Sequence, residues 1–185
     1  MDIARQPFVV GGAGKPRLAQ SGDPIEFSFA HSESHALVAL SADGPVGIDI
    51  EAARAVRISP DRRALLEAAA EALAPVPLPS GPADRRFLQA WVRLEAVAKL
   101  TGEGISALLG RLGVRSRSAA GPSSREFSDV AARSIVRDLA AGLPPQLHAA
   151  VAVPCGSRGL AGETPLVTSL PLDAGSLEAL VTCRS

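Results

Sequence analysis

The longest regular pattern in the chain is helical and runs from about Ala83 to Leu100, before a terminating Gly102. Ser59-Pro60-Asp61 predicts the start of an earlier helix, with a serine N-cap and a proline at the first helical position, that continues to about Leu73. Strand-like segments come before and after these two helices in the sequence. This order predicts an α+β fold in which an antiparallel sheet packs on one long helix.

The strand-like segments are marked by alternation and by short apolar runs. Residues 25–30 alternate and predict a half-buried strand, and residues 36–41 predict a strand buried on both faces. The turn signal Asp43-Gly44-Pro45 leads into a third strand at Val46–Glu51, so we expect a three-stranded meander. A loop is predicted at residues 116–124, and a later pair of strands is predicted at residues 134–139 and 146–153.

Length and composition limit the organisation of the chain. Its 185 residues suit one well-buried domain, which we place at residues 1–153, followed by a weakly patterned tail at 154–185 that packs on the domain or is irregular. The formal net charge is zero, which argues against general binding to nucleic acid or to a membrane surface. No signal peptide, membrane-spanning run or paired-cysteine motif is recognised, so a cytoplasmic location is expected.

The third predicted strand carries a candidate cation site. Period-two geometry places Gly47, Asp49 and Glu51 on one face of this strand. Two carboxylates beside a glycine suit a hard cation with oxygen ligands. An equally weighted interpretation is that Glu51 is solvated at the strand end and Asp49 caps a neighbour.

The long helix carries a second candidate group. Its core stripe is predicted to be Phe87, Trp91, Leu94 and Ala98. Glu95 and Lys99 lie one turn apart beside this stripe, where partial burial is expected. The alternative is an exposed ion pair that contributes about 0.3–0.5 kcal/mol.

Two further residue types are informative. Among 19 basic residues only Lys15 and Lys99 are lysines, which hints at positions where a compact ammonium is needed. His31 lies at the end of the first predicted strand, where a histidine is more often a structural hydrogen-bonding group than a ligand or base.

Four segments in order resemble a known motif set. Gly14-Lys15-Pro16, Phe29-Ala30-His31-Ser32, Val46–Glu51 and Trp91–Lys99 resemble the motifs of the phosphopantetheinyl transferases. The likeness covers roughly residues 11–153 and is closest to the two-halved, monomeric type that serves peptide and polyketide synthases. The resemblance implies transfer of phosphopantetheine from coenzyme A to a carrier-protein serine, with Mg²⁺ as cofactor and with coenzyme A and the carrier protein as partners.

The resemblance also implies roles for particular residues. It assigns Mg²⁺ to Asp49, Glu51 and Glu95, and contacts with coenzyme A to Lys15, Pro16, His31 and Lys99. Glu95 and Lys99 are then the catalytic pair, with Glu95 taking the proton of the carrier serine. Three carboxylates about 4 Å apart would repel by about 4 kcal/mol per pair, a penalty that a divalent ion removes.

This chain departs from the motif set at three places. Leu94 stands where the family usually has lysine, and Ala30 stands where it usually has serine. Only 13 residues precede Gly14, so we expect a truncated first half. These departures keep open an alternative function, a non-catalytic relative that binds coenzyme A or a carrier protein without turnover.

A truncated first half has a structural consequence. It would leave the strand face of Ile25, Phe27 and Phe29 without a covering helix. We expect the tail, a second copy of the chain or another protein to cover that face, and we favour the tail or self-association.

Overall fold

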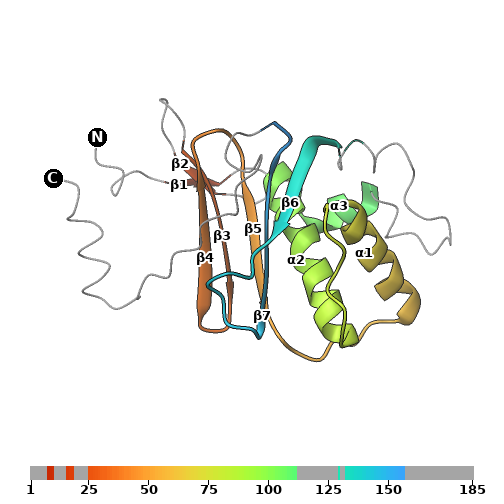
Figure 1. Cartoon of the computed structure of the whole chain (residues 1–185). Helices are drawn as coiled ribbons and strands as arrows, with labels where there is room; N and C mark the ends of the chain where they lie inside the picture. Colours follow the sequence, from red (N-terminus) through yellow and green to blue (C-terminus); the bar gives the residue numbers. More distant parts are fainter. Residues whose placement is uncertain (1–7, 11–15, 19–24, 112–128, 130–131, 157–185) are drawn as a thin grey trace.

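Strands and helices occupy opposite sides of the molecule. The structure, a computed structural model, describes residues 8–10, 16–18, 25–111, 129 and 132–156. In Figure 1 the strands stand on one side and the three labelled helices on the other. The α+β class, with an antiparallel sheet packed on a long helix, is confirmed. Within the described ranges, no helix combines the length and apolar character needed to cross a membrane.

The two predicted helices form where their end signals place them. Helix α1 spans Pro60–Ala72, and the Ser59 hydroxyl accepts a hydrogen bond from the Arg62 N–H at 3.4 Å. Helix α2 spans Ala83–Thr101 and ends at Gly102, whose φ of 71° is the left-handed conformation that glycine adopts without a Cβ clash. The long helix therefore has the length that its sequence predicts.

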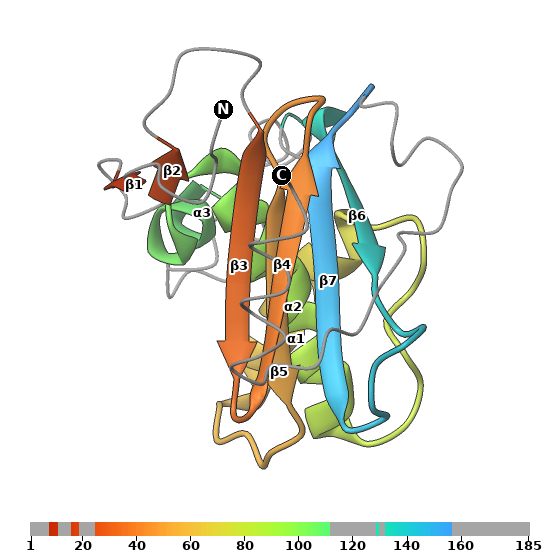
Figure 2. The same ribbon diagram turned by 90° about the vertical axis from the view of Figure 1, so that its left-hand side faces the viewer.

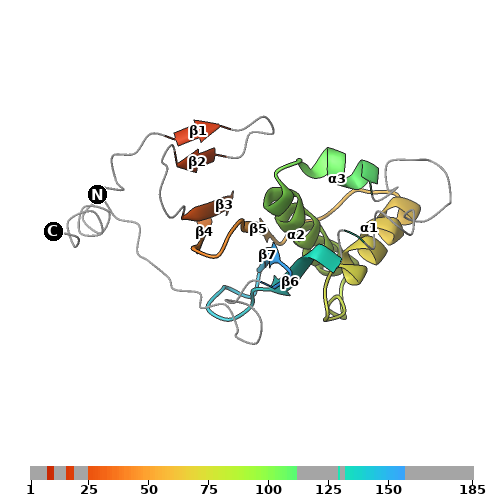
Figure 3. The same ribbon diagram turned by 90° about the horizontal axis from the view of Figure 1, so that it is seen from above.

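A three-stranded antiparallel sheet supports one face of α2. Its strands are β5 (Gly47–Ala52), β7 (Leu147–Pro154) and β6 (Ser134–Asp138), in the order β5-β7-β6. The predicted pairing of the two late strands is confirmed. Figure 3 shows this sheet between α2 and a separate hairpin.

That hairpin consists of β3 (Glu26–Ser32) and β4 (His35–Ser41). Figure 2 views it from the outside, with β3 and β4 in front of β5 and the helices behind. The hydroxyls of Ser28 and Ser32 accept hydrogen bonds from the N–H groups of Ile48 and Ala52, at 3.2 and 2.9 Å. These bonds satisfy donors on the free edge of β5.

The predicted three-stranded meander is wrong in its second pairing, between β4 and β5. Strand β5 forms its backbone ladder with β7 and not with β4. The reason is that β5 is buried on both faces, between α2 and the hairpin, so it belongs to the middle layer of the molecule.

The prediction that residues 36–41 are buried on both faces is also wrong. Strand β4 alternates between half-buried and exposed residues, and Val38 and Leu40 are 63% and 71% exposed. Phe29 on β3 lies opposite Val38 and is 53% exposed. Across the described residues, the outer face of the hairpin therefore exposes apolar side chains. What covers this face stays a prediction.

Two apolar clusters flank the three-stranded sheet. One joins α1, α2 and α3 to the helix-facing side, where Leu94 and Val136 are fully buried. The other lies under the hairpin, where Ala30 packs with Ile48 and Ile50. Strand β7 supplies Ala150 and Ala152 to the first cluster, where they pack with residues of α2. The three-stranded sheet therefore positions α2.

Three short elements are absent from the sequence prediction. They are β1 (Phe8–Val10), its partner β2 (Pro16–Leu18), and helix α3 (Ile105–Arg111). Each is too short to produce a clear periodic pattern. The predicted loop at 116–124 lies outside the described residues, as does the predicted tail beyond residue 156, and the domain boundary at 153 stays a prediction.

Candidate active site

The site begins with an unusually close contact between β5 and α2. A Cβ atom built on Gly47 would overlap the carbonyl oxygen of Ala96 and lie 2.5 Å from the backbone nitrogen of Leu100. Only glycine lets the strand and the helix backbones approach this closely. As a result, the side chains that follow on the same strand face lie directly beside α2.

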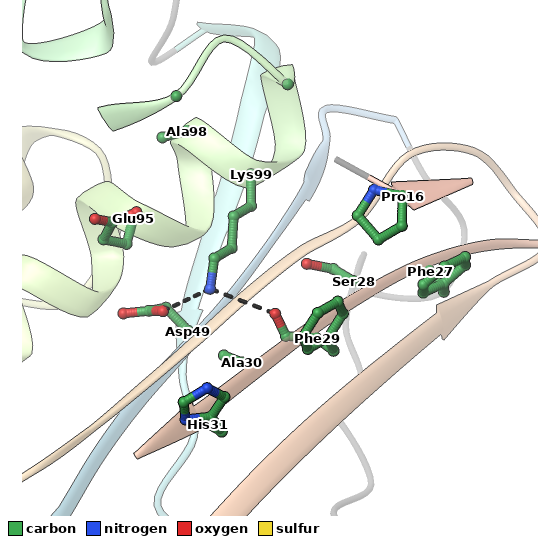
Figure 4. Close-up of a pocket in the computed structure, with 12 residues that line it drawn as sticks. Pro16, Phe27, Ser28, Phe29, Ala30, His31, Asp49, Glu95, Ala98 and Lys99 are labelled. Carbon is green, nitrogen blue, oxygen red and sulfur yellow. Dashed lines mark hydrogen bonds and ion pairs between the residues drawn. The ribbon is translucent and has the colours of Figure 1, made fainter. Parts of the chain in front are cut away.

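Asp49 and Lys99 form the central contact of the site. Lys99 Nζ lies 2.7 Å from Asp49 Oδ1 and 3.4 Å from the carbonyl oxygen of Phe29 (Figure 4). Lysine 99 therefore joins α2 to β5 and β3. The predicted alternative, an exposed pair between Glu95 and Lys99, is replaced by this cross-element ion pair.

Burial raises the pKa values of two carboxyl groups in the site. Burial raises the pKa of Asp49, although Lys99 opposes this shift and the charge of Glu51 adds to it. Burial also raises the pKa of Glu95, and the charge of Asp49 raises it further. Asp49 and Glu95 thus lie in one electrostatic environment that penalises their negative charges.

A cavity of about 420 Å³ opens over these groups. It lies between the C-terminal half of α2 and strand β3, and Pro16 of β2 completes one wall (Figure 4). Five residues predicted from the sequence line it together: Pro16, His31, Asp49, Glu95 and Lys99. Gly102 and Gly104, which the sequence prediction did not include, line it as well. The spacing Gly102-Glu103-Gly104 directly after the charged end of the helix is a sequence signal that could have identified them.

Residues 45–152 match the sequence profile of the 4'-phosphopantetheinyl transferase superfamily. The chain belongs to this superfamily. It is also 38% identical over 102 residues to the 4'-phosphopantetheinyl transferase psf-1 of Bacillus pumilus. That alignment covers 54% of this chain and 41% of the relative, so the chain spans less than half the length of the curated protein it matches.

Leu94 has a structural explanation within this superfamily member. Its side chain is fully buried in the cluster that joins α1 and α2 to the sheet. The other residues of the predicted core stripe belong to the same cluster: Phe87 and Ala98 are buried, and Trp91 is partly buried against it. A lysine at position 94 would leave an ammonium among these side chains, so the leucine is a packing residue here.

Glu51 does not line the cavity. It lies two residues beyond Asp49 on β5, and its carboxylate is 3.4 Å from Arg54. Across the described ranges, no three His, Cys, Asp or Glu side chains are grouped closely enough to hold a metal ion. The ligand set Asp49, Glu51 and Glu95 therefore stays a prediction, as does the role of Lys15, which lies outside the described residues.

His148 adds a polar group that the sequence prediction does not include. It lies on β7 directly opposite Glu51 of β5 and is buried. Burial lowers its pKa, and the nearby positive charge of Arg85 lowers it further. Only the pairing of β5 with β7 reveals that this histidine faces the same side of the sheet as the carboxylates.

Proposed function

We propose that this chain transfers 4'-phosphopantetheine from coenzyme A to a serine of an acyl- or peptidyl-carrier protein, in a Mg²⁺-dependent reaction. The main support is the convergence of Asp49, Glu95, Lys99 and His31 on one cavity in a member of this superfamily. An open cavity of this size, lined by charged groups that include the ammonium of Lys99, suits a ligand with an anionic diphosphate. The cytoplasmic location predicted from the sequence is kept as part of this proposal.

Glu95 is the candidate general base. In the proposed step the carrier serine oxygen forms a bond to the phosphorus on the pantetheine side of the diphosphate. The bond from that phosphorus to the bridging oxygen breaks, which releases adenosine 3',5'-bisphosphate, and the serine proton passes to Glu95. A carboxyl with a raised pKa accepts this proton more readily than an ordinary glutamate.

Lys99 is the candidate diphosphate contact. Lys99 lines the cavity, and its ammonium contacts Asp49 and the Phe29 carbonyl. A compact, rotatable ammonium can exchange one carboxylate oxygen for a phosphate oxygen while it stays in place. Pro16, His31 and Lys15 are proposed to bind the nucleotide end of coenzyme A.

Carboxylate oxygens are the ligand type that Mg²⁺ prefers, although Glu51 stands outside the cavity that Asp49 and Glu95 line. Asp49 and Glu95 are destabilised as anions, and Glu51 contributes to the rise in pKa of both. Asp49, Glu51 and Glu95 would hold Mg²⁺, which would supply charge stabilisation for the phosphoryl group during transfer. The partners Lys99 and Arg54 would then be released from Asp49 and Glu51.

A second candidate function is binding of coenzyme A or a carrier protein without turnover. The observation that favours it is the fully buried Leu94, which removes a cation from the family's usual helix motif. Glu51 also stands outside the cavity and contacts Arg54. Both features weaken the catalytic assembly while leaving the cavity intact.

The deciding experiment measures the intact mass of an apo carrier protein after incubation with this chain, coenzyme A and Mg²⁺. The transferase proposal predicts a mass gain of one phosphopantetheine, lost in Glu95→Gln. Coenzyme A binding without a mass gain, across several carrier proteins, would support the second candidate. Absence of both binding and transfer would refute both functions.

A further inference from the structure

The buried pair Arg93–Asp138 occupies a special place relative to the site. Asp138 on β6 and Asp49 on β5 both lie opposite Ala150 of β7, so the three residues form one row across the sheet. The row spans two strand spacings, about 9.5 Å. Arg93 binds the carboxylate at one end of this row, and Lys99 binds the carboxylate at the other.

Arg93 donates two parallel hydrogen bonds to the carboxylate of Asp138. Its Nε donates to Oδ1 at 2.7 Å and one terminal nitrogen donates to Oδ2 at 2.6 Å, while the side chain is fully buried. The same terminal nitrogen contacts the carbonyl of Pro77 at 3.3 Å. Gln89, one turn earlier, donates to Asp138 at 2.8 Å and to the Ala149 carbonyl at 3.2 Å. This bidentate geometry fixes direction as well as distance.

The two ion pairs lie on opposite flanks of the buried face of α2. Arg93 and Lys99 are six residues apart, which separates them by about 120° around the helix and about 9 Å along it. Between them Ala96 meets Gly47 of β5. Two anchors on opposite flanks resist rolling of the helix, which a single anchor does not. A roll of about 10° would move side-chain atoms by about 1 Å.

The chemistry of Arg93 indicates that its main effect is on the orientation of α2 and not on the stability of the fold. Its remaining terminal nitrogen is buried and finds no hydrogen-bond partner within the described part of the chain. A buried ion pair is often no more stable than well-packed apolar side chains of similar volume. An apolar pair would fill this space but would not set the rotation of α2.

We propose that Arg93 and Asp138 are positioning residues, whose bidentate contact sets the rotation of α2 so that Lys99 and Glu95 face Asp49. The importance of this contact for turnover rests on the proposed transferase function. The effect of this contact on the geometry of Lys99 does not depend on that function. The positioning proposal and the transferase proposal can therefore be refuted independently.

The test measures how fast the Lys99 amine is acylated by an amine-reactive reagent, followed by peptide mass spectrometry. Lysine 99 must leave Asp49 before it reacts, and Lys15, the other lysine of the chain, serves as an internal reference. The variants are Asp138→Asn, which keeps the side-chain shape, and the double variant Arg93→Met/Asp138→Leu, which replaces the pair with apolar groups. Asp84→Asn is the matched control, because Asp84 pairs with Arg63 at the other end of α2.

Positioning predicts that acylation of Lys99 rises about fivefold in Asp138→Asn, the factor expected when a partly exposed ion pair is lost. It predicts the same rise in the double variant even when the melting temperature returns to that of the wild type. Asp84→Asn leaves the rate unchanged. For turnover, kcat falls more than the KM for coenzyme A changes. A wild-type acylation rate in folded Asp138→Asn overturns the proposal, and this variant decides the matter if the double variant does not fold.

Discussion

Replacing Gly47 with alanine tests whether the close approach of β5 and α2 builds the site. The added methyl group would overlap the Ala96 carbonyl and crowd the Leu100 nitrogen. Both are backbone atoms of a helix, so neither can rotate away, and α2 must move as a unit. Overpacking of this kind costs about 1–3 kcal/mol, which lowers the melting temperature of a chain of this size by about 2–12 °C.

The same movement would separate Lys99 from Asp49. A misplacement of about 1 Å can lower turnover by about 100-fold. Circular dichroism and Trp91 fluorescence give the stability of Gly47→Ala, and the carrier mass assay gives its rate. The control is Gly81→Ala, where nothing lies within 4 Å but φ is 123°, so backbone strain lowers stability without moving α2. Unchanged melting temperature and rate in Gly47→Ala would refute this account of the site.

Four further outcomes are expected. Asp49→Ala lowers metal-dependent transfer by more than 100-fold, because loss of even an outer contact of a metal site costs about 10–100-fold; full activity in the presence of a chelator would remove the metal assignment. Lys99→Ala weakens coenzyme A binding in calorimetry and costs up to about 1 kcal/mol of stability, since Asp49 loses its partner; unchanged affinity would restrict Lys99 to a structural role. Glu95→Gln abolishes transfer and, without added metal, raises the melting temperature at neutral pH, because burial and the charge of Asp49 raise the pKa of Glu95 in the folded chain; retained transfer would exclude Glu95 as the base. We expect residues 155–185 to cover the exposed hairpin face, so their deletion lowers the melting temperature or drives self-association in sedimentation. If the full-length and truncated chains are both stable monomers of equal melting temperature, that expectation is refuted.

Periodicity was sufficient to locate the main elements. Strand β5 and helix α2 were predicted within one or two residues, because alternation and capping are local properties of the sequence. The partner of β5 could not be predicted in the same way. A turn at Asp43-Gly44-Pro45 is compatible with a hairpin or with a change of layer, and only burial of both faces of β5 decides between them.

The candidate site shows the same division. Asp49, Glu95 and Lys99 were identified from spacing and from motif order, and the structure brings them to one cavity. Their pairing was not predicted, because Glu95 and Lys99 share a helix face while the observed ion pair joins Lys99 to a different element. Long-range contacts of this kind depend on sheet register, which a single sequence does not encode locally.

The electrostatics of the site oppose folding stability. Asp49 and Glu95 have raised pKa values, so between the ordinary range near 4 and those raised values the folded chain binds more protons than the unfolded chain. Stability contributed by these groups therefore falls as pH rises through that window and is lowest when both are ionised. Lys99 offsets part of this cost at Asp49, and Glu95 has no hydrogen-bonded cation of its own among the described residues. A site that keeps an under-compensated carboxylate beside a cavity is suited to bind a cation or to accept a proton, which is the chemistry that the proposed transfer requires.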